Sequence, residues 1–183
     1  MIKTELKQSK LSLDAFLDHY SDLDDGLKYE FNNGIVEVRK QVDQQSLCLQ
    51  RTLLHLFIQT MIYKKGGILT FSTDMFTSTN KLRRPDLAIY TKEQIEAAAK
   101  GENQIAAWVA EVISNSDSLK RTDLKIDEYF DAGVKVVWQI MPFSKKVYVF
   151  TAPDELKVCR GETICSAIPA LDDFEIKAEE IFA

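Results

Sequence analysis

The sequence predicts a mixed α/β fold, with a mixed β-sheet flanked by helices and an N-terminal β-hairpin. Three observations lead to this class. Two segments in which apolar and polar residues alternate meet at Asn33-Gly34. Two longer segments carry apolar residues near helical spacing, and short apolar runs separated by turn residues fill the second half of the chain. The order hairpin, helix, strands, helix, strands is typical of helices packed against a mixed sheet.

A short helix and the hairpin come first. Ser12 stands at an N-cap position, and the pattern after it predicts a helix from about Leu13 to Tyr20. The stretch "LKYEFNNGIVEVRK" predicts the hairpin, because Asn33-Gly34 supplies the positive φ that a type I′ turn needs.

The main core helix is predicted from Asp43 to Lys64, where Gly66-Gly67 stops it. Its apolar positions are Leu47, Leu53, Leu54, Phe57, Ile58 and Met61. The segments "GILTFS", "DMFTST" and "PDLAIY" then predict strands.

A helix, "TKEQIEAAAKG", and a buried strand, "QIAAWVAEVIS", follow. A second amphipathic helix is predicted from about Asp117 to Ala132, with Ser116 as its cap and Gly133 after its end. Strands are predicted at "VKVVWQIM", "KKVYVFT" and "LKVCR", and "DDFEIKAEEIF" closes the chain as a short strand or helix.

Composition narrows the class of protein. We expect the 183 residues, 1–183, to form a single domain, since 45% are hydrophobic and 28% charged. No stretch resembles a signal peptide, and the longest apolar segments are about half of a membrane span, so we expect a cytoplasmic protein without a membrane partner. The three cysteines lack the spacing of a disulfide framework or zinc site.

The net charge of −5 opposes unspecific adhesion to nucleic acid, so a polyanionic partner must be met locally. Basic residues cluster in three places, which we interpret first as solvated faces. The clusters are Lys81, Arg83 and Arg84, then Lys120, Arg121 and Lys125, and then Lys145 and Lys146.

Two acids stand out on predicted strands. Glu111 lies inside the apolar run "AAWVAEVIS", where an ionised carboxylate is costly without a partner, and Asp86 opens the preceding strand. If these strands pair antiparallel, the start of one lies beside the end of the other, and the carboxylates converge. Mg²⁺ favours one or two carboxylates with water, and its charge compensates a buried acid, so we expect a metal site here.

Lys125 is the third predicted member of the site. It follows Glu111 on the next helix, one turn before Tyr129, so its stem can lie along apolar surface while its ammonium reaches the carboxylates. Such a lysine can hold an attacking water or neutralise a phosphate oxygen. The turn "SNSDS", which contains Ser114, adds hydroxyl groups near a helix N-terminus.

At these residues the chain resembles a known family. "RRPDLAIY" and "WVAEVISNSDSLKRTDLKIDEYFDAGVKVVW" resemble the signature segments of the Uma family of restriction-endonuclease-like proteins, within the PD-(D/E)XK nuclease superfamily. "LKYEFNNGIVEV" is similar to that family's N-terminal hairpin. The resemblance covers roughly residues 10 to 180. It implies a restriction-endonuclease-like core and metal-dependent phosphodiester hydrolysis, with Mg²⁺ as cofactor and Mn²⁺ as a substitute.

The resemblance also assigns roles to residues. It implies that Asp86 and Glu111 bind the metal and that Glu30, in "YEF", supports the site. Ile113 stands where the superfamily's usual lysine would fall, and the resemblance implies that Lys125 takes that role. Tyr129, in the spacing K-x-x-x-Y-x-x-x-G, and Ser114 are expected to support the metal ligands.

The sequence therefore predicts a metal-dependent endonuclease acting on DNA, with Asp86, Glu111 and Lys125 as catalytic residues. The rival hypothesis is a catalytically silent module of the same fold that binds nucleic acid or protein. Val136 and Met141, which replace acids of the family pattern, and the negative net charge favour this rival. The choice between DNA and RNA, and a homodimer that cuts both strands, stay open.

Overall fold

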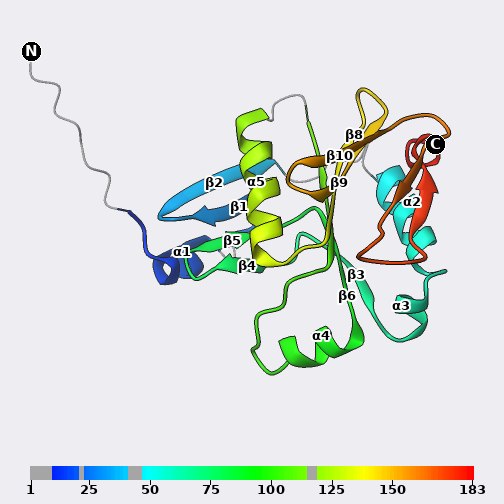
Figure 1. Cartoon of the computed structure of the whole chain (residues 1–183). Helices are drawn as coiled ribbons and strands as arrows, with labels where there is room; N and C mark the ends of the chain where they lie inside the picture. The colour runs from blue at the N-terminus through cyan, green and yellow to red at the C-terminus, as the bar shows by residue number, and fades with distance from the viewer. Residues whose placement is uncertain (1–9, 21–22, 41–46, 115–118) are drawn as a thin grey trace, which may run out of the picture.

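The computed structural model describes residues 10–20, 23–40, 47–114 and 119–183, and it confirms the predicted mixed α/β class (Figure 1). The strands of a six-stranded sheet are, in spatial order, β10 (Glu155–Cys159), β9 (Lys146–Ala152), β8 (Val136–Met141), β7 (Trp108–Val112), β6 (Leu87–Tyr90) and β3 (Ile68–Phe71). Strands β7 and β8 are parallel and the other neighbours are antiparallel, so this sheet is mixed.

Two further sheets accompany the six-stranded sheet. The four-stranded sheet has the order β2 (Ile35–Lys40), β1 (Leu27–Asn32), β5 (Lys81–Arg83) and β4 (Met75–Ser78). The two-stranded sheet consists of β11 (Ile164–Ser166) and β12 (Glu175–Lys177). The helices are α1 (Leu13–Tyr20), α2 (Leu47–Phe57), α3 (Met61–Lys64), α4 (Lys92–Ala98), α5 (Leu119–Ala132) and α6 (Ala178–Ile181).

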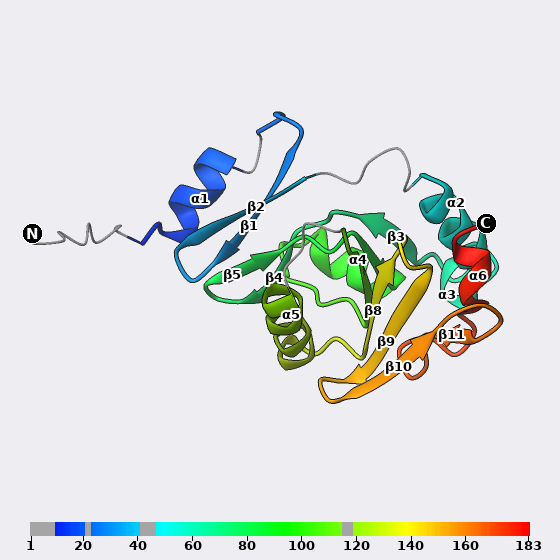
Figure 2. The same cartoon turned by 90° about the horizontal axis from the view of Figure 1, so that it is seen from above.

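Helices cover both faces of the six-stranded sheet (Figure 2). Side chains of a strand alternate between its faces, so Trp108 and Ala110 of β7 pack in a core with Leu53 of α2. Val109, between them, packs in a second core with Ile126 of α5. The face of β7 that carries Val109 therefore looks toward α5.

The N-terminal elements agree with the sequence. Helix α1 has the predicted bounds, and the Ser12 Oγ accepts a hydrogen bond of 3.2 Å from the Ala15 N–H, as an N-cap does. Strands β1 and β2 form the predicted hairpin, in which Asn33 and Gly34 have φ values of 50° and 91°. The turn thus fixes a register that places Glu30 opposite Glu37.

The single helix predicted from Asp43 to Lys64 is wrong, because α2 ends at Phe57 and α3 begins at Met61. Thr60 interrupts it: its Oγ1 donates to the Phe57 carbonyl at 2.7 Å and accepts from the Tyr63 N–H at 3.2 Å. This hydroxyl serves as the N-cap of α3, so the helix ends and a new one begins. The predicted start at 43–46 lies outside the described residues.

The helical spacing of that segment also overstated its burial. Leu53 and Phe57 are in the core, whereas Leu47, Leu54, Ile58 and Met61 are exposed. The cap proposed at Ser116 lies outside the described residues. Strands β5 and β11 were not predicted, since each has only three residues. None of the helices in the part of the chain described here is long and apolar enough to cross a membrane.

Candidate nuclease site

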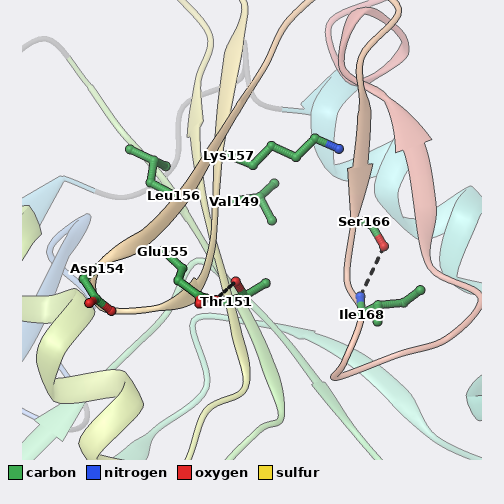
Figure 3. A pocket seen from close by; sticks show the side chains of 8 residues that line it. All are labelled: Val149, Thr151, Asp154, Glu155, Leu156, Lys157, Ser166 and Ile168. Carbon is green, nitrogen blue, oxygen red and sulfur yellow. Dashed lines mark hydrogen bonds between the residues drawn. The ribbon is translucent and has the colours of Figure 1, made fainter.

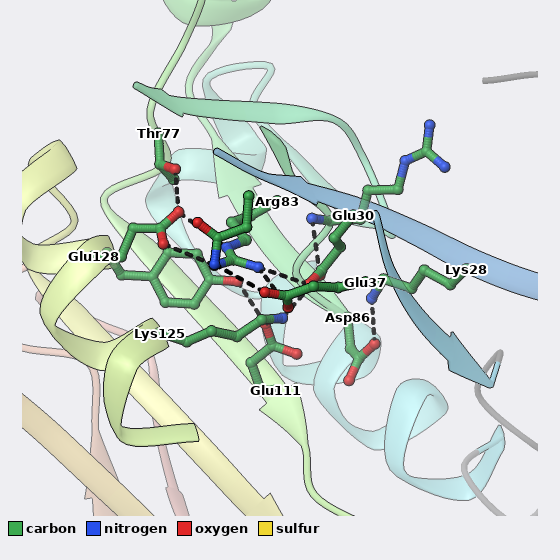
Figure 4. A network of polar contacts seen from close by, with 12 residues as sticks. Lys28, Glu30, Glu37, Thr77, Arg83, Asp86, Glu111, Lys125 and Glu128 are labelled. Carbon is green, nitrogen blue, oxygen red and sulfur yellow. Dashed lines mark hydrogen bonds and ion pairs between the residues drawn. The ribbon is translucent and has the colours of Figure 1, made fainter. Parts of the chain in front are cut away.

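Asp86 and Glu111 lie together because their strands pair and because both side chains point to the same face of the sheet. Strands β6 and β7 are antiparallel with Leu87 opposite Ala110, so the residue before β6 lies beside Glu111. Residues two apart on a strand point to the same face. Glu111 therefore shares the face of Val109, and Asp86 shares the face of Ala88. Val109 and Ala88 both belong to the core that packs against α5. Both carboxylates therefore point to the α5 side at one end of the sheet (Figure 4).

Glu111 is 2% exposed and is held by two side chains of α5. Its Oε1 accepts hydrogen bonds from Lys125 Nζ at 2.9 Å and from the Tyr129 hydroxyl at 2.5 Å. Residues four apart share one face of a helix, so α5 presents both donors to the strand. Burial and the charges of Glu111 and Glu30 raise the pKa of Tyr129 well above its ordinary value, so its hydroxyl keeps its proton and donates.

The lysine of this pair also joins the two larger sheets. Lys125 Nζ lies 2.8 Å from Glu30 Oε1, and the Glu30 side chain is fully buried on β1. The ammonium is therefore shared between an acid of the four-stranded sheet and Glu111 of the six-stranded sheet. Burial and the charge of Glu111 raise the pKa of Glu30, but the charges of Lys125, Lys28 and Arg83 outweigh them and hold this pKa below its ordinary value.

Asp86 has a different set of partners. Lys28 Nζ of β1 lies 2.7 Å from its Oδ1, and the Val112 N–H donates to its Oδ2 at 2.8 Å. Burial raises the pKa of Asp86, and the charge of Glu111 raises it further, so these effects exceed the lowering by Lys28 and Val112. The influence of Glu111 reflects two carboxylates at close range.

A buried arginine network adjoins the carboxylate pair. Arg83 of β5, 2% exposed, donates to both Glu128 oxygens at 2.9 and 2.8 Å and to Glu37 Oε2 at 2.9 Å. It also lies 3.4 Å from Glu30 Oε2, and Thr77 of β4 donates to Glu128. Salt bridges thus connect the four-stranded sheet to α5 around the site (Figure 4).

The donor chemistry of the acid pair fits Mg²⁺. Among the residues that the structure describes, no group of three or more His, Cys, Asp or Glu side chains is arranged to hold a metal. Mg²⁺ ordinarily uses one or two carboxylates and fills its remaining positions with water and substrate oxygens. Asp86 and Glu111 offer such a pair of hard donors, each neutralised here by the ammonium of Lys28 or Lys125.

A separate pocket lies between the β9–β10 hairpin and β11 (Figure 3). It has a volume of about 530 Å³, and its lining includes Thr151, Glu155, Lys157 and Ser166. Thr151 donates to Glu155 at 3.0 Å, and the Ser166 Oγ accepts from a backbone N–H, so these polar groups bond within the lining. Buried acids converge instead at Asp86, where we place the candidate site.

Ser114 differs from the other predicted site residues. It lies beyond the end of β7 and is exposed, whereas Glu30, Asp86, Glu111, Lys125 and Tyr129 are buried in one cluster.

Sequence reasoning missed Lys28, Arg83 and Glu128. Lys28 precedes Glu30 by two positions on a predicted strand, so parity already placed both on one face. Glu128 follows Lys125 by three positions, which is a helical neighbour spacing. The interpretation of Arg83 as part of a solvated basic cluster is wrong, because three acids surround its guanidinium.

Comparison with known proteins supports a nuclease. The family model Uma2, described as "Putative restriction endonuclease", matches residues 13–179. The chain belongs to the Uma2 family. The Uma2 chain is also similar to a solved structure from Anabaena variabilis, titled a "putative nuclease belonging to DUF820", with a TM-score of 0.78. That likeness covers 94% of this chain and 97% of the other at 15% identity, so it shows the fold.

The restriction-endonuclease-like core predicted from the sequence is therefore confirmed for this Uma2 protein. The search of curated proteins gave no match.

The hydroxyl of Tyr129 is expected to contribute to stability in this Uma2 protein. Tyr129→Phe removes a donor from the buried carboxylate of Glu111, so the free energy of unfolding should fall by about 1.5–3 kcal/mol. Urea denaturation measures this difference. Tyr63→Phe is the control, because Tyr63 is 47% exposed and its change should stay within about 0.5 kcal/mol. Equal effects of the two substitutions would contradict the assigned hydrogen bond.

Proposed function

We propose that this Uma2 protein is a metal-dependent endonuclease that hydrolyses phosphodiester bonds of DNA. One observation carries the proposal: the carboxylates of Asp86, just before β6, and of Glu111, on β7, converge in a buried cluster with the ammonium of Lys125. Asp86 and Glu111 would hold Mg²⁺, or Mn²⁺ in its place.

When bound, the ion supplies a coordinated water of lowered pKa and offsets charge on the phosphate. Lys125 would donate to the attacking water or to a phosphate oxygen, where its positive charge would stabilise the transition state. Glu111 and Glu30 hold its ammonium from two sides, which reduces its conformational freedom before substrate binds. Tyr129, on the same face of α5, donates to the same Glu111 oxygen and fixes the carboxylate.

Metal binding provides the direct test. Calorimetric titration with Mn²⁺ should show a site in the wild-type protein and at least a tenfold loss of affinity in Asp86→Asn, which removes one anionic ligand. Asp74→Asn is the matched control, since Asp74 is an exposed acid paired with Arg84 and should leave Mn²⁺ affinity unchanged. Excess chelator should stop plasmid cleavage by the wild-type protein. Equal Mn²⁺ binding by Asp86→Asn and wild type would remove Asp86 from the metal site.

The second candidate function is a catalytically silent module that binds nucleic acid or protein. One observation favours it: Lys28 and Lys125 already neutralise Asp86 and Glu111 without a metal. Such a module would give no heat of Mn²⁺ binding and would leave plasmid intact at any Mg²⁺ concentration, so the same titration separates the two functions.

A further inference from the structure

Lys28 is a buried lysine for which the proposed chemistry has no role. It is 4% exposed, lies on β1, and places its Nζ 2.7 Å from Asp86 Oδ1 (Figure 4). Buried lysines are rare unless paired, so this contact gives the side chain its electrostatic partner. Lys28 thus occupies part of the space around a proposed metal ligand.

The contact sets up a competition at Asp86. Its Oδ2 is bonded to the Val112 N–H, and its Oδ1 is bonded to the Lys28 ammonium. A divalent cation at Oδ1 would lie close to that ammonium, and two cations at such range in a buried site repel strongly. Metal binding therefore requires the Lys28 ammonium to leave Asp86 or to shift away from it.

The neighbouring acid, Glu30, is already paired with other cations. Glu30 Oε1 already accepts from Lys125 Nζ at 2.8 Å and from the Arg84 N–H at 3.2 Å, and Glu30 Oε2 lies 3.4 Å from Arg83. A nucleic-acid substrate brings a new anion, its backbone phosphate, to the metal. The lysine side chain has a flexible four-carbon stem, so its ammonium can move from Asp86 to a phosphate oxygen nearby.

We propose that Lys28 is an exchangeable counter-ion: it neutralises Asp86 without metal and, when a divalent cation displaces it, binds a phosphate oxygen of the nucleic-acid backbone. This rests on the proposed function, because it assumes that Asp86 is a metal ligand. Lys28 would then be a substrate-binding residue that couples metal binding to phosphate binding.

Calorimetric titration with Mn²⁺ at pH 8 tests whether Lys28 competes with the metal for Asp86. Lys28→Met removes the competing charge, so its Mn²⁺ affinity should rise roughly tenfold over wild type. Lys28→Arg keeps a cation and should bind Mn²⁺ no more tightly than wild type. Lys81→Met is the matched control: Lys81 lies 3.2 Å from Glu128 in the adjoining network, and its loss should change affinity less than about threefold.

Binding of a DNA duplex tests whether the displaced Lys28 binds a backbone phosphate. Fluorescence anisotropy with a labelled oligonucleotide duplex and Ca²⁺, which takes the same kind of oxygen ligands, should show roughly tenfold weaker binding for Lys28→Met. Thermal unfolding of each variant verifies folding, and Lys28→Gln replaces Lys28→Met if the latter does not fold.

Tighter Mn²⁺ binding together with weaker duplex binding by the neutral variant supports the inference. Mn²⁺ binding by Lys28→Met that equals or falls below that of wild type overturns it, and so does unchanged duplex binding. Absence of Mn²⁺ binding by wild type is a distinct result, because it overturns the proposed function as well.

Discussion

Supercoiled plasmid incubated with Mg²⁺ and the Glu111→Gln protein is expected to be cleaved at least roughly 10²–10³-fold more slowly than with wild type. The substitution preserves the size of the side chain and an oxygen that accepts from Lys125 and Tyr129. It removes the negative charge, which is what a divalent cation needs from this position. The loss therefore reports on metal binding and charge compensation more than on packing.

Agarose gel electrophoresis of the time course gives the rates of nicking and linearisation. Glu96→Gln is the matched control, because Glu96 is exposed on α4 and pairs with Lys92 in a surface ion pair. This control should cleave at the wild-type rate. If Glu111→Gln cleaved as fast as the control in matched preparations, the assignment of Glu111 as a catalytic ligand would be wrong.

The sequence was sufficient to predict the strands that carry the acids. The apolar runs "AAWVAEVIS" and "PDLAIY" indicated the two strands. Their antiparallel pairing, which the residue pattern alone left as a condition, is present and brings Asp86 to Glu111. Helical spacing placed Lys125 and Tyr129 on one face of α5. The strand and helix predictions succeeded because each depends on a local residue pattern, which the chain expresses without help from distant segments.

The ionic surroundings depended on long-range packing and were harder to predict. Lys28 meets Asp86 across 58 positions of sequence, and Arg83 meets Glu128 across 45. A charged residue on a short strand looks the same in the sequence whether it faces water or an acid of another sheet. The break at Thr60 was missed because a threonine within an apolar helical pattern does not show in the sequence whether its hydroxyl bonds the backbone and ends the helix.

Both of the larger sheets contribute charged residues to the site. Glu30 and Lys28 come from the four-stranded sheet, whereas Asp86 and Glu111 lie at the end of the six-stranded sheet. The cluster is complete only when the two sheets are held against α5. Arg83 of the four-stranded sheet makes two hydrogen bonds to Glu128 of α5, so it links the stability of the fold to the geometry of the site.

Arg83→Met is accordingly expected to lower the free energy of unfolding by about 3–5 kcal/mol at pH 7, because buried carboxylates lose their common partner. Glu128 keeps Thr77 and Lys81, but neither replaces the paired bonds from the guanidinium. Urea denaturation followed by tryptophan fluorescence measures the change. Lys81→Met is the control, since Lys81 is 28% exposed and its pair should contribute less than about 1 kcal/mol.

At acidic pH, the difference in the free energy of unfolding between Arg83→Met and wild type should become smaller. Burial raises the pKa of Glu128, but hydrogen bonds and charge from Arg83, with Thr77 and Lys81, hold it below the ordinary value of 4.5. A lowered pKa in the folded state stabilises the protein above the unfolded-state value, and this contribution is lost as the pH falls through the folded-state value. The stability gap should thus be widest near pH 7 and shrink below about pH 4.5. A gap that stays constant down to pH 3 would show that Arg83 acts through packing of its stem and not through its charge.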